Sequence, residues 1–111
     1  MWRMMVKTKL DPAQLEANAS AAAAFLRAMA NDKRLMVLCQ LVEGEKSVSQ
    51  LLDGSDLSQS ALSQHLARLR DENLVATRRA AQTVFYSIAD PAAAKLLATL
   101  AEIFCPEIAD D

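Results

Sequence analysis

Residues 57–69 read LSQSALSQHLARL, and this stretch decides the fold. Its leucines recur at spacings of four and three, which puts them on one face of a helix. Ser58 stands just before that helix and can cap it, because a serine oxygen accepts a hydrogen bond from a free backbone N–H at a helix start. The pattern predicts an amphipathic helix over about 59–72. Its inward face is Leu62, Leu66 and Leu69.

A second short helix is expected directly before it. The segment from Ser47 to Gln50 has the spacing of a capping box, a serine followed three residues later by a glutamine, and predicts a helix over about 48–53. Gly54–Leu57 then forms a compact turn. Two short helices joined by a tight turn are typical of a helix-turn-helix.

A β-hairpin is expected after these helices. Val75–Arg79 and Thr83–Ile88 are rich in strand-forming residues and alternate in polarity. Ala80–Gln82 lies between them, and because it lacks glycine and asparagine the sequence leaves the turn type open. A helix-turn-helix followed by a hairpin predicts a winged helix-turn-helix.

Three more helices complete the expected fold. They span about 12–30, about 32–43 and the segment from Pro91 onward. Asn31 or Asp32 can cap the second of the three, Gly44 can end it, and Asp90 can cap the last. The 32–43 helix is expected to place four side chains on one apolar face. They are Leu35, Leu38, Cys39 and Val42.

The expected fold class is therefore mainly α with a β-hairpin wing, in the order α-α-α-α-β-β-α. The 111 residues are 52% hydrophobic and 23% charged, which is typical of a globular protein with one hydrophobic core. We expect a single winged helix-turn-helix domain over residues 1–111, with residues 1–11 as a flexible N-terminus.

The outer face of the 59–72 helix carries serine and glutamine side chains and no carboxylate until its far end. Glutamine can pair bidentately with adenine, and serine can contact several base edges or a phosphate. Because a reading helix contacts bases with its N-terminal residues, we expect this face in a DNA groove. The alternative is a merely solvated helix face. The candidate contacts are Ser58, Gln59, Ser60, Ser63, Gln64, His65 and Arg68.

The hairpin favours the DNA interpretation. Arg78 and Arg79 lie beside its tip, with Gln82 and Thr83 across the turn. Arginines on a wing suit phosphates or a narrow minor groove. Residues 58–86 hold four arginines and two carboxylates, although the whole protein has a net charge of −2. This local basic character predicts double-stranded DNA as the partner.

The last helix shows a wide apolar arc that exceeds what the core of a 111-residue monomer needs, and the first helix carries a narrower apolar seam. A two-fold homodimer through these helices would bury both surfaces. It would also place two reading helices about one DNA turn apart, which suits an inverted-repeat operator. The alternative is ordinary monomer core. The expected interface residues are Leu15, Ala22, Leu26, Leu96, Leu97, Leu100, Ile103 and Phe104.

Three stretches resemble the ArsR/SmtB repressors. Residues 57–69 closely resemble the recognition-helix signature, Met29–Leu35 resembles the start of the second helix, and Gln82–Tyr86 resembles the returning strand of the wing. The resemblance covers about residues 20–105. It implies a homodimeric transcriptional repressor that an effector releases from DNA.

The sequence departs from the metal-sensing members of that family. Those members carry a cysteine pair where this chain has Ser47 and Ser49, and an Asp-x-His pattern where it has Asp90, Pro91 and Ala92. Serine and alanine are poor ligands for soft or borderline metals. We therefore expect no metal site and no cofactor.

The two cysteines resemble another branch of the family, the persulfide sensors related to BigR, SqrR and HlyU. The similar segments are Leu38–Leu41 and Ile103–Pro106. The resemblance implies that Cys39 and Cys105 form a dithiol switch, which reactive sulfur species or oxidants close and which then weakens DNA binding. From the residues alone, Cys39 also fits a small buried hydrophobic side chain, and a non-thiol effector is an alternative.

Other functions find little support in the sequence. His65 is the only histidine and no glycine-rich phosphate loop is present, so we expect no enzyme. No apolar run approaches the roughly 20 residues of a membrane helix, and residues 1–7 lack a secretory signal. We therefore expect no membrane contact and a cytoplasmic location with reduced thiols. A winged helix that docks to a protein is the other alternative, and salt-dependent duplex binding would distinguish DNA recognition from it.

Overall fold

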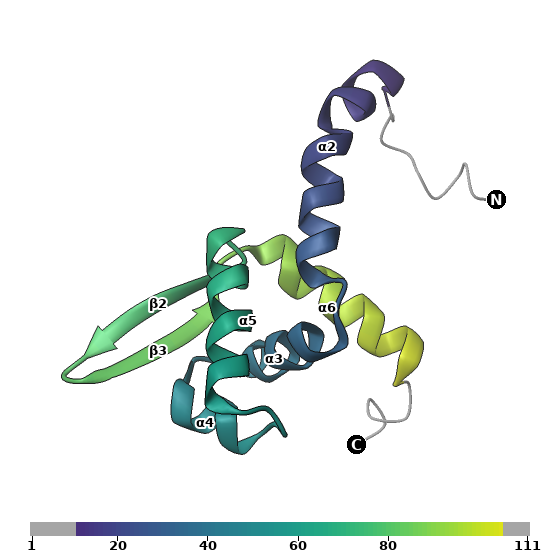
Figure 1. The fold of residues 1–111 in the computed structure, drawn as a ribbon. Coiled ribbons are helices and arrows are strands. Elements are labelled where there is room, and N and C mark those ends of the chain that lie inside the picture. The colour runs from purple at the N-terminus through teal and green to yellow at the C-terminus, as the bar shows by residue number, and fades with distance from the viewer. Residues whose placement is uncertain (1–10, 106–111) are drawn as a thin grey trace.

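The computed structural model describes residues 11–105, which form a helical body with a projecting hairpin (Figure 1). In chain order the elements are α2 (Pro12–Met29), α3 (Asp32–Val42), β1 (Lys46–Ser47), α4 (Val48–Asp53), α5 (Gln59–Asp71), β2 (Val75–Ala80), β3 (Thr83–Ile88) and α6 (Pro91–Phe104). The predicted mainly helical fold with a hairpin wing is confirmed. The segment expected to be flexible, residues 1–11, lies outside the described residues except for Asp11, which caps α2. No helix within residues 11–105 is long and apolar enough to cross a bilayer.

Side-chain caps start the helices where the sequence predicted them. Asn31, and not Asp32, caps α3, because its Oδ1 accepts a hydrogen bond from the Arg34 backbone N–H at 3.0 Å. Ser47 and Gln50 form the complete capping box of α4. The Gln50 N–H donates to Ser47 Oγ at 3.2 Å, and the Ser47 N–H donates to Gln50 Oε1 at 2.8 Å.

The hairpin has a third strand that the predicted order of elements lacked. β1 is two residues long and pairs antiparallel with β3, so the sheet order is β1-β3-β2. Lys46 lies opposite Tyr86, and Ser47 lies opposite Phe85. Two residues are too few for an alternating pattern to show in the sequence. β1 joins the wing to the segment that opens α4.

The tip of the wing is a two-residue turn. The last strand pair is Ala80 with Thr83, so Ala81 and Gln82 form the loop and Ala80 belongs to β2 rather than to the turn. Ala81 has a φ of 56°, a left-handed conformation that costs a residue with a Cβ about 1–2 kcal/mol. A positive φ at the first loop position is typical of the primed turn types that close two-residue hairpins.

The core is built around α3, which contacts α2, α5, α6 and β3. The three inward leucines predicted for α5 are all buried. The predicted inward face of α3 is partly wrong, because Val42 is 48% exposed and Cys39 is exposed as well. Those two residues line shallow grooves beside α6 instead. The residues that α3 buries are Val37, Leu38 and Leu41.

α2 projects from the body along much of its length (Figure 1). Residues 11–22 are exposed, and only the C-terminal end of the helix is buried. Arg34 of α3 fastens this end: its Nε donates to the Ala28 carbonyl at 2.6 Å and its Nη2 donates to the Arg27 carbonyl at 3.3 Å. The last carbonyls of a helix lack partners within the helix, so a guanidinium suits this position.

Arg34→Met should lower the free energy of unfolding by about 1.5–3 kcal/mol, because hydrogen bonds from a charged donor to the end of α2 are lost. Urea denaturation followed by circular dichroism measures this change. Arg27→Met removes an exposed guanidinium from α2 and should change the free energy of unfolding by less than about 0.5 kcal/mol. Equal losses in the two variants would show that Arg34 does not fasten α2.

Candidate nucleic-acid interface and thiol groove

α5 presents the polar face that the sequence predicted. Ser58 is exposed but serves as the helix cap, since its Oγ accepts a hydrogen bond from the Ala61 N–H at 3.2 Å. His65 is half-buried, and Arg68 Nε lies 4.0 Å from a carboxylate oxygen of Glu72. Four of the predicted base contacts are exposed on the N-terminal part of the helix, and one of them, Ser60, has its Oγ 3.5 Å from Ser58 Oγ. The four are Gln59, Ser60, Ser63 and Gln64.

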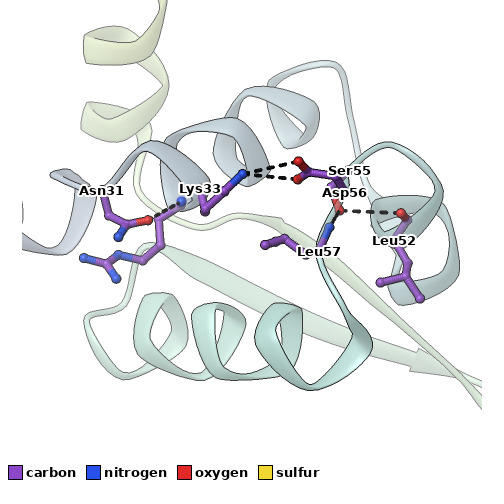
Figure 2. Close-up of polar contacts among 7 residues, drawn as sticks. Asn31, Lys33, Leu52, Ser55, Asp56 and Leu57 are labelled. Carbon is purple, nitrogen blue, oxygen red and sulfur yellow. Dashed lines mark hydrogen bonds and ion pairs between the residues drawn. The ribbon is translucent and has the colours of Figure 1, made fainter.

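The turn before α5, residues 54–57, is bound to α3 by an ion pair. Lys33 Nζ lies 3.2 Å from Asp56 Oδ1 and 3.5 Å from Oδ2 (Figure 2). Ser55 Oγ donates to the Leu52 carbonyl at 3.5 Å and accepts from the Leu57 N–H at 3.3 Å. The hydrogen bond and charge of the ammonium lower the pKa of Asp56, so the carboxylate is ionised at neutral pH. The pairing offsets a negative charge close to the start of the reading helix.

The two wing arginines have different environments. Arg78 makes a bidentate pair with Glu45, with Nε–Oε2 at 2.9 Å and Nη2–Oε1 at 2.8 Å, and its guanidinium lies 4.7 Å from the ring centre of Phe85. The pair lowers the pKa of Glu45 and raises the pKa of Arg78. Arg79 is exposed and has no ion pair within the described part of the chain. The other predicted wing contacts, Gln82 and Thr83, are exposed at or beside the tip.

Sequence reasoning missed Glu45. It lies 33 positions from Arg78, and the two meet because β1 pairs with β3 and brings the segment before Ser47 alongside the hairpin. Nothing in the local pattern around Glu45 indicates a strand. The contact follows only from the sheet, in which Arg78 and Ser47 both pair with Phe85, so no sequence signal indicated it.

The two cysteines, far apart in the sequence, lie on one groove between α3 and α6. This thiol groove has a volume of about 300 Å³, and no charged side chain lines it. Both thiols are exposed and free. Partial burial raises the pKa of the Cys39 thiol, and the nearby Cys105 raises it further because two thiolate charges repel. The lining residues are Leu35, Met36, Cys39, Leu97, Leu100, Ala101, Phe104 and Cys105.

The residues predicted for a dimer interface are mostly on the surface of the single chain. Leu97 is the exception: it is 3% exposed and packs into the core of its own chain, and its assignment to the interface stays a prediction. Met36 and Val42 of α3 add exposed apolar surface that was not predicted. The exposed predicted residues are Leu15, Ala22, Leu26, Ile103 and Phe104, and the half-buried ones are Leu96 and Leu100.

The positions where metal sensors carry cysteines have other roles here. Ser47 is buried and caps α4, and Ser49 is exposed on that helix. Among residues 11–105, no three His, Cys, Asp or Glu side chains gather closely enough to hold a metal ion. That the protein functions without a metal stays a prediction.

A capped reading helix, the helix-turn-helix that positions it and a hairpin wing together define a winged helix-turn-helix, DNA-binding transcriptional regulator. Residues 31–77 match the family model described as "Bacterial regulatory protein, arsR family". The nodulation protein NolR of Rhizobium meliloti is 50% identical over 93 residues, which are 84% of this chain and 76% of that protein. The chain therefore belongs to the ArsR family of bacterial regulatory proteins.

Solved structures agree with this assignment. Reduced HlyU from Vibrio cholerae N16961 is 46% identical and superposes with a TM-score of 0.79, over 83% of this chain and 97% of that one. The transcriptional repressor BigR from Xylella fastidiosa is 38% identical with a TM-score of 0.80, over 86% of this chain and 98% of that one. The resemblance seen in the sequence, including the branch that contains BigR and HlyU, is confirmed.

Gln64→Ala should weaken operator binding by about 1–3 kcal/mol and relax sequence preference, because a side chain that reads a base edge is lost. Arg79→Gln should weaken binding to operator and unrelated duplex alike. It should also reduce the slope of log affinity against log salt by about 0.9 for each phosphate that the protein no longer neutralises. Fluorescence anisotropy with both duplexes at several salt concentrations measures these effects.

Matched controls come from α2, where Gln14 and Arg27 are exposed. Gln14→Ala and Arg27→Gln make the same chemical changes away from the reading helix and the wing, and both should leave duplex binding close to wild type. A Gln64→Ala variant that loses affinity equally on both duplexes would contradict base reading by this side chain.

Proposed function

We propose that the protein is a homodimeric transcriptional repressor that binds an inverted-repeat operator when reduced and leaves it when reactive sulfur species link Cys39 to Cys105. The observation that carries the proposal is the thiol groove, whose walls bring thiols from α3 and α6 together. The description of BigR as a repressor supports repression as the direction of control. A DNA ligand implies a cytoplasmic location, where cysteines are normally reduced.

The linking chemistry needs a persulfide as co-reactant and no metal. One cysteine thiolate takes the outer sulfur of a persulfide RSSH, which forms a protein persulfide and releases RSH. The other cysteine thiolate attacks the inner sulfur of that persulfide, forms a disulfide between Cys39 and Cys105, and expels hydrogen sulfide. Exchange of this disulfide with a further RSSH inserts the outer sulfur of RSSH between the two cysteines and releases RSH, and the longer bridge suits thiols whose Cα atoms are more than about 7 Å apart.

The link would act on DNA through packing. α3 contacts α5, which carries the reading face, and it contacts α6, which carries Cys105 beyond its last residue. A covalent bridge draws α6 toward α3 and changes the surface that α6 offers to a second protomer. A change of about 1.4 kcal/mol in binding free energy already shifts operator affinity tenfold.

A second copy of the chain is the proposed partner for the exposed apolar surface. α2 buries little of itself against its own chain, yet Leu15 and Leu26 lie on it, and Phe104 at the end of α6 is 75% exposed. Exposed apolar surface of this extent marks an interaction site. A two-fold dimer buries this apolar surface on both copies and places their two reading helices side by side for adjacent turns of DNA.

Leu26→Asp should convert the dimer to a monomer at micromolar concentration, because a carboxylate would be buried in an apolar contact without a partner. Sedimentation velocity measures the state. Ser20→Asp adds the same charge on another side of α2 and should leave the dimer intact. A wild-type protein that is monomeric at this concentration would contradict the proposed assembly.

Treatment with inorganic polysulfide should release the wild-type protein from operator DNA, and mass spectrometry should find sulfur that joins Cys39 to Cys105. Cys39→Ser and Cys105→Ser should bind DNA as the wild type does and should ignore the treatment. The link should form faster at pH 9 than at pH 7, because the raised pKa of Cys39 leaves little thiolate at neutral pH.

Two outcomes would reject parts of this proposal. Full release of either serine variant by polysulfide would mean that the effector is not sensed by a dithiol. Reduced protein that binds no duplex at low salt but captures a partner protein would favour the docking-module alternative.

A further inference from the structure

We propose that Glu45 is a specificity-determining residue, which withholds Arg78 from DNA phosphates and so suppresses sequence-independent binding. The contacts of Arg78 carry the inference. The Nε–Nη2 edge of its guanidinium is occupied by the two carboxylate oxygens of Glu45, at 2.9 and 2.8 Å, and the ring centre of Phe85 lies 4.7 Å from the guanidinium carbon. This role operates in the reduced protein and is separate from the thiol switch.

The fold builds this arrangement partway along the wing, where Arg78 is the fourth of the six residues of β2. Gly44 ends the α3 segment with a φ of 145°, a conformation that residues with a Cβ rarely adopt, and the chain then turns into β1. β1 pairs with β3, and Arg78 of β2 pairs with Phe85 of β3. Glu45 therefore meets Arg78 from the opposite edge of the same sheet.

An exposed ion pair is usually weak, but this one has unusual support. Bidentate geometry and a charged donor make its hydrogen bonds stronger than those of a single surface contact, and the ring beneath fixes the plane of the guanidinium. To offer a phosphate its two parallel donors, the Nε and Nη2 N–H groups, Arg78 must leave both oxygens of Glu45. A phosphate that approached the intact pair would also meet the negative charge of Glu45.

The consequence for DNA falls mainly on unrelated sequences. Non-specific affinity comes almost entirely from phosphate contacts, whereas specific affinity also includes base contacts, here assigned to side chains such as Gln64 on α5. Withholding one arginine per wing lowers the non-specific contribution and leaves base reading untouched. The ratio of operator affinity to non-specific affinity rises as a result.

The test compares reduced wild-type protein, Glu45→Gln, Arg78→Gln and the double variant on operator and on unrelated duplex across salt. Glu45→Gln should bind the unrelated duplex more tightly, and its salt slope should steepen by about 0.9 for each additional phosphate that the freed arginine neutralises. Between 50 and 200 mM salt, that slope amounts to about a 3- to 4-fold greater loss of affinity per phosphate. In the Arg78→Gln background, the Glu45→Gln substitution should have no such effect.

Glu43→Gln is the charge-matched control, because Glu43 lies two residues away, is exposed and pairs with Lys46 instead. If losing one negative charge has a general effect on DNA affinity, Glu43→Gln should change the affinity by the same factor in the wild-type background and in the Arg78→Gln background. Glu45→Asp is the second variant: it keeps the charge but is too short for the same bidentate pair, so it should also steepen the salt slope.

Three results would overturn the proposal. The first is an unchanged salt slope in both Glu45 variants. The second is tighter DNA binding by Glu45→Gln that persists in the Arg78→Gln background. The third is tighter DNA binding by Glu43→Gln that depends on Arg78 as strongly as the effect of Glu45→Gln does. Thermal unfolding of each variant checks that it is folded. Failure of all proteins to bind either duplex would instead reject DNA recognition itself.

Discussion

The burial of α3 is the constraint on which the rest of the structure depends. Its buried stripe, centred on Leu38, fixes the helix among α2, α5, α6 and β3, and its remaining side chains then serve different parts of the molecule. Lys33 holds the turn before the reading helix, Arg34 fastens α2, and Cys39 lines the thiol groove. The chain that leaves α3 places Glu45 beside the wing. A displacement of α3 would therefore alter the turn before the reading helix, the end of α2, the thiol groove and the wing together.

Ion pairs decide which charges of this acidic protein are presented to DNA. Near the reading helix, Lys33 compensates Asp56, so an acidic residue does not repel phosphates there. On the wing the compensation runs the other way, because Glu45 compensates Arg78. Net charge over the whole chain is a poor guide to nucleic-acid binding for this reason, since the field that DNA meets is local.

Sequence reasoning succeeded where a pattern is long or a cap is local. The leucine spacing of α5 and the capping box of α4 are decided by residues three or four positions apart, and the structure has both. It failed where tertiary contacts decide the outcome. β1 exists because β3 offers it a partner edge, and two residues leave no periodic trace.

Burial was the second source of error. Apolar spacing on α3 and α6 identified amphipathic helices, but the stripe that each helix buries depends on how its neighbours sit. Cys39 proved exposed and Leu97 proved to be core. Both cysteines were found because their sequence context resembles a known branch, whereas their shared groove follows only from the packing of α6 on α3.

The surroundings of Ser47 restrict which residues can replace it. It ends β1, pairs opposite Phe85, is buried and closes the capping box, so its hydroxyl is a structural acceptor. A cysteine at this position, as in the metal-sensing branch, would replace that oxygen with sulfur, a weak acceptor, and would cost about 1 kcal/mol of cap energy before any metal was bound. The oxygen at position 47 is thus tied to the folding of this chain, and a soft-metal ligand cannot be introduced there without loosening the start of α4.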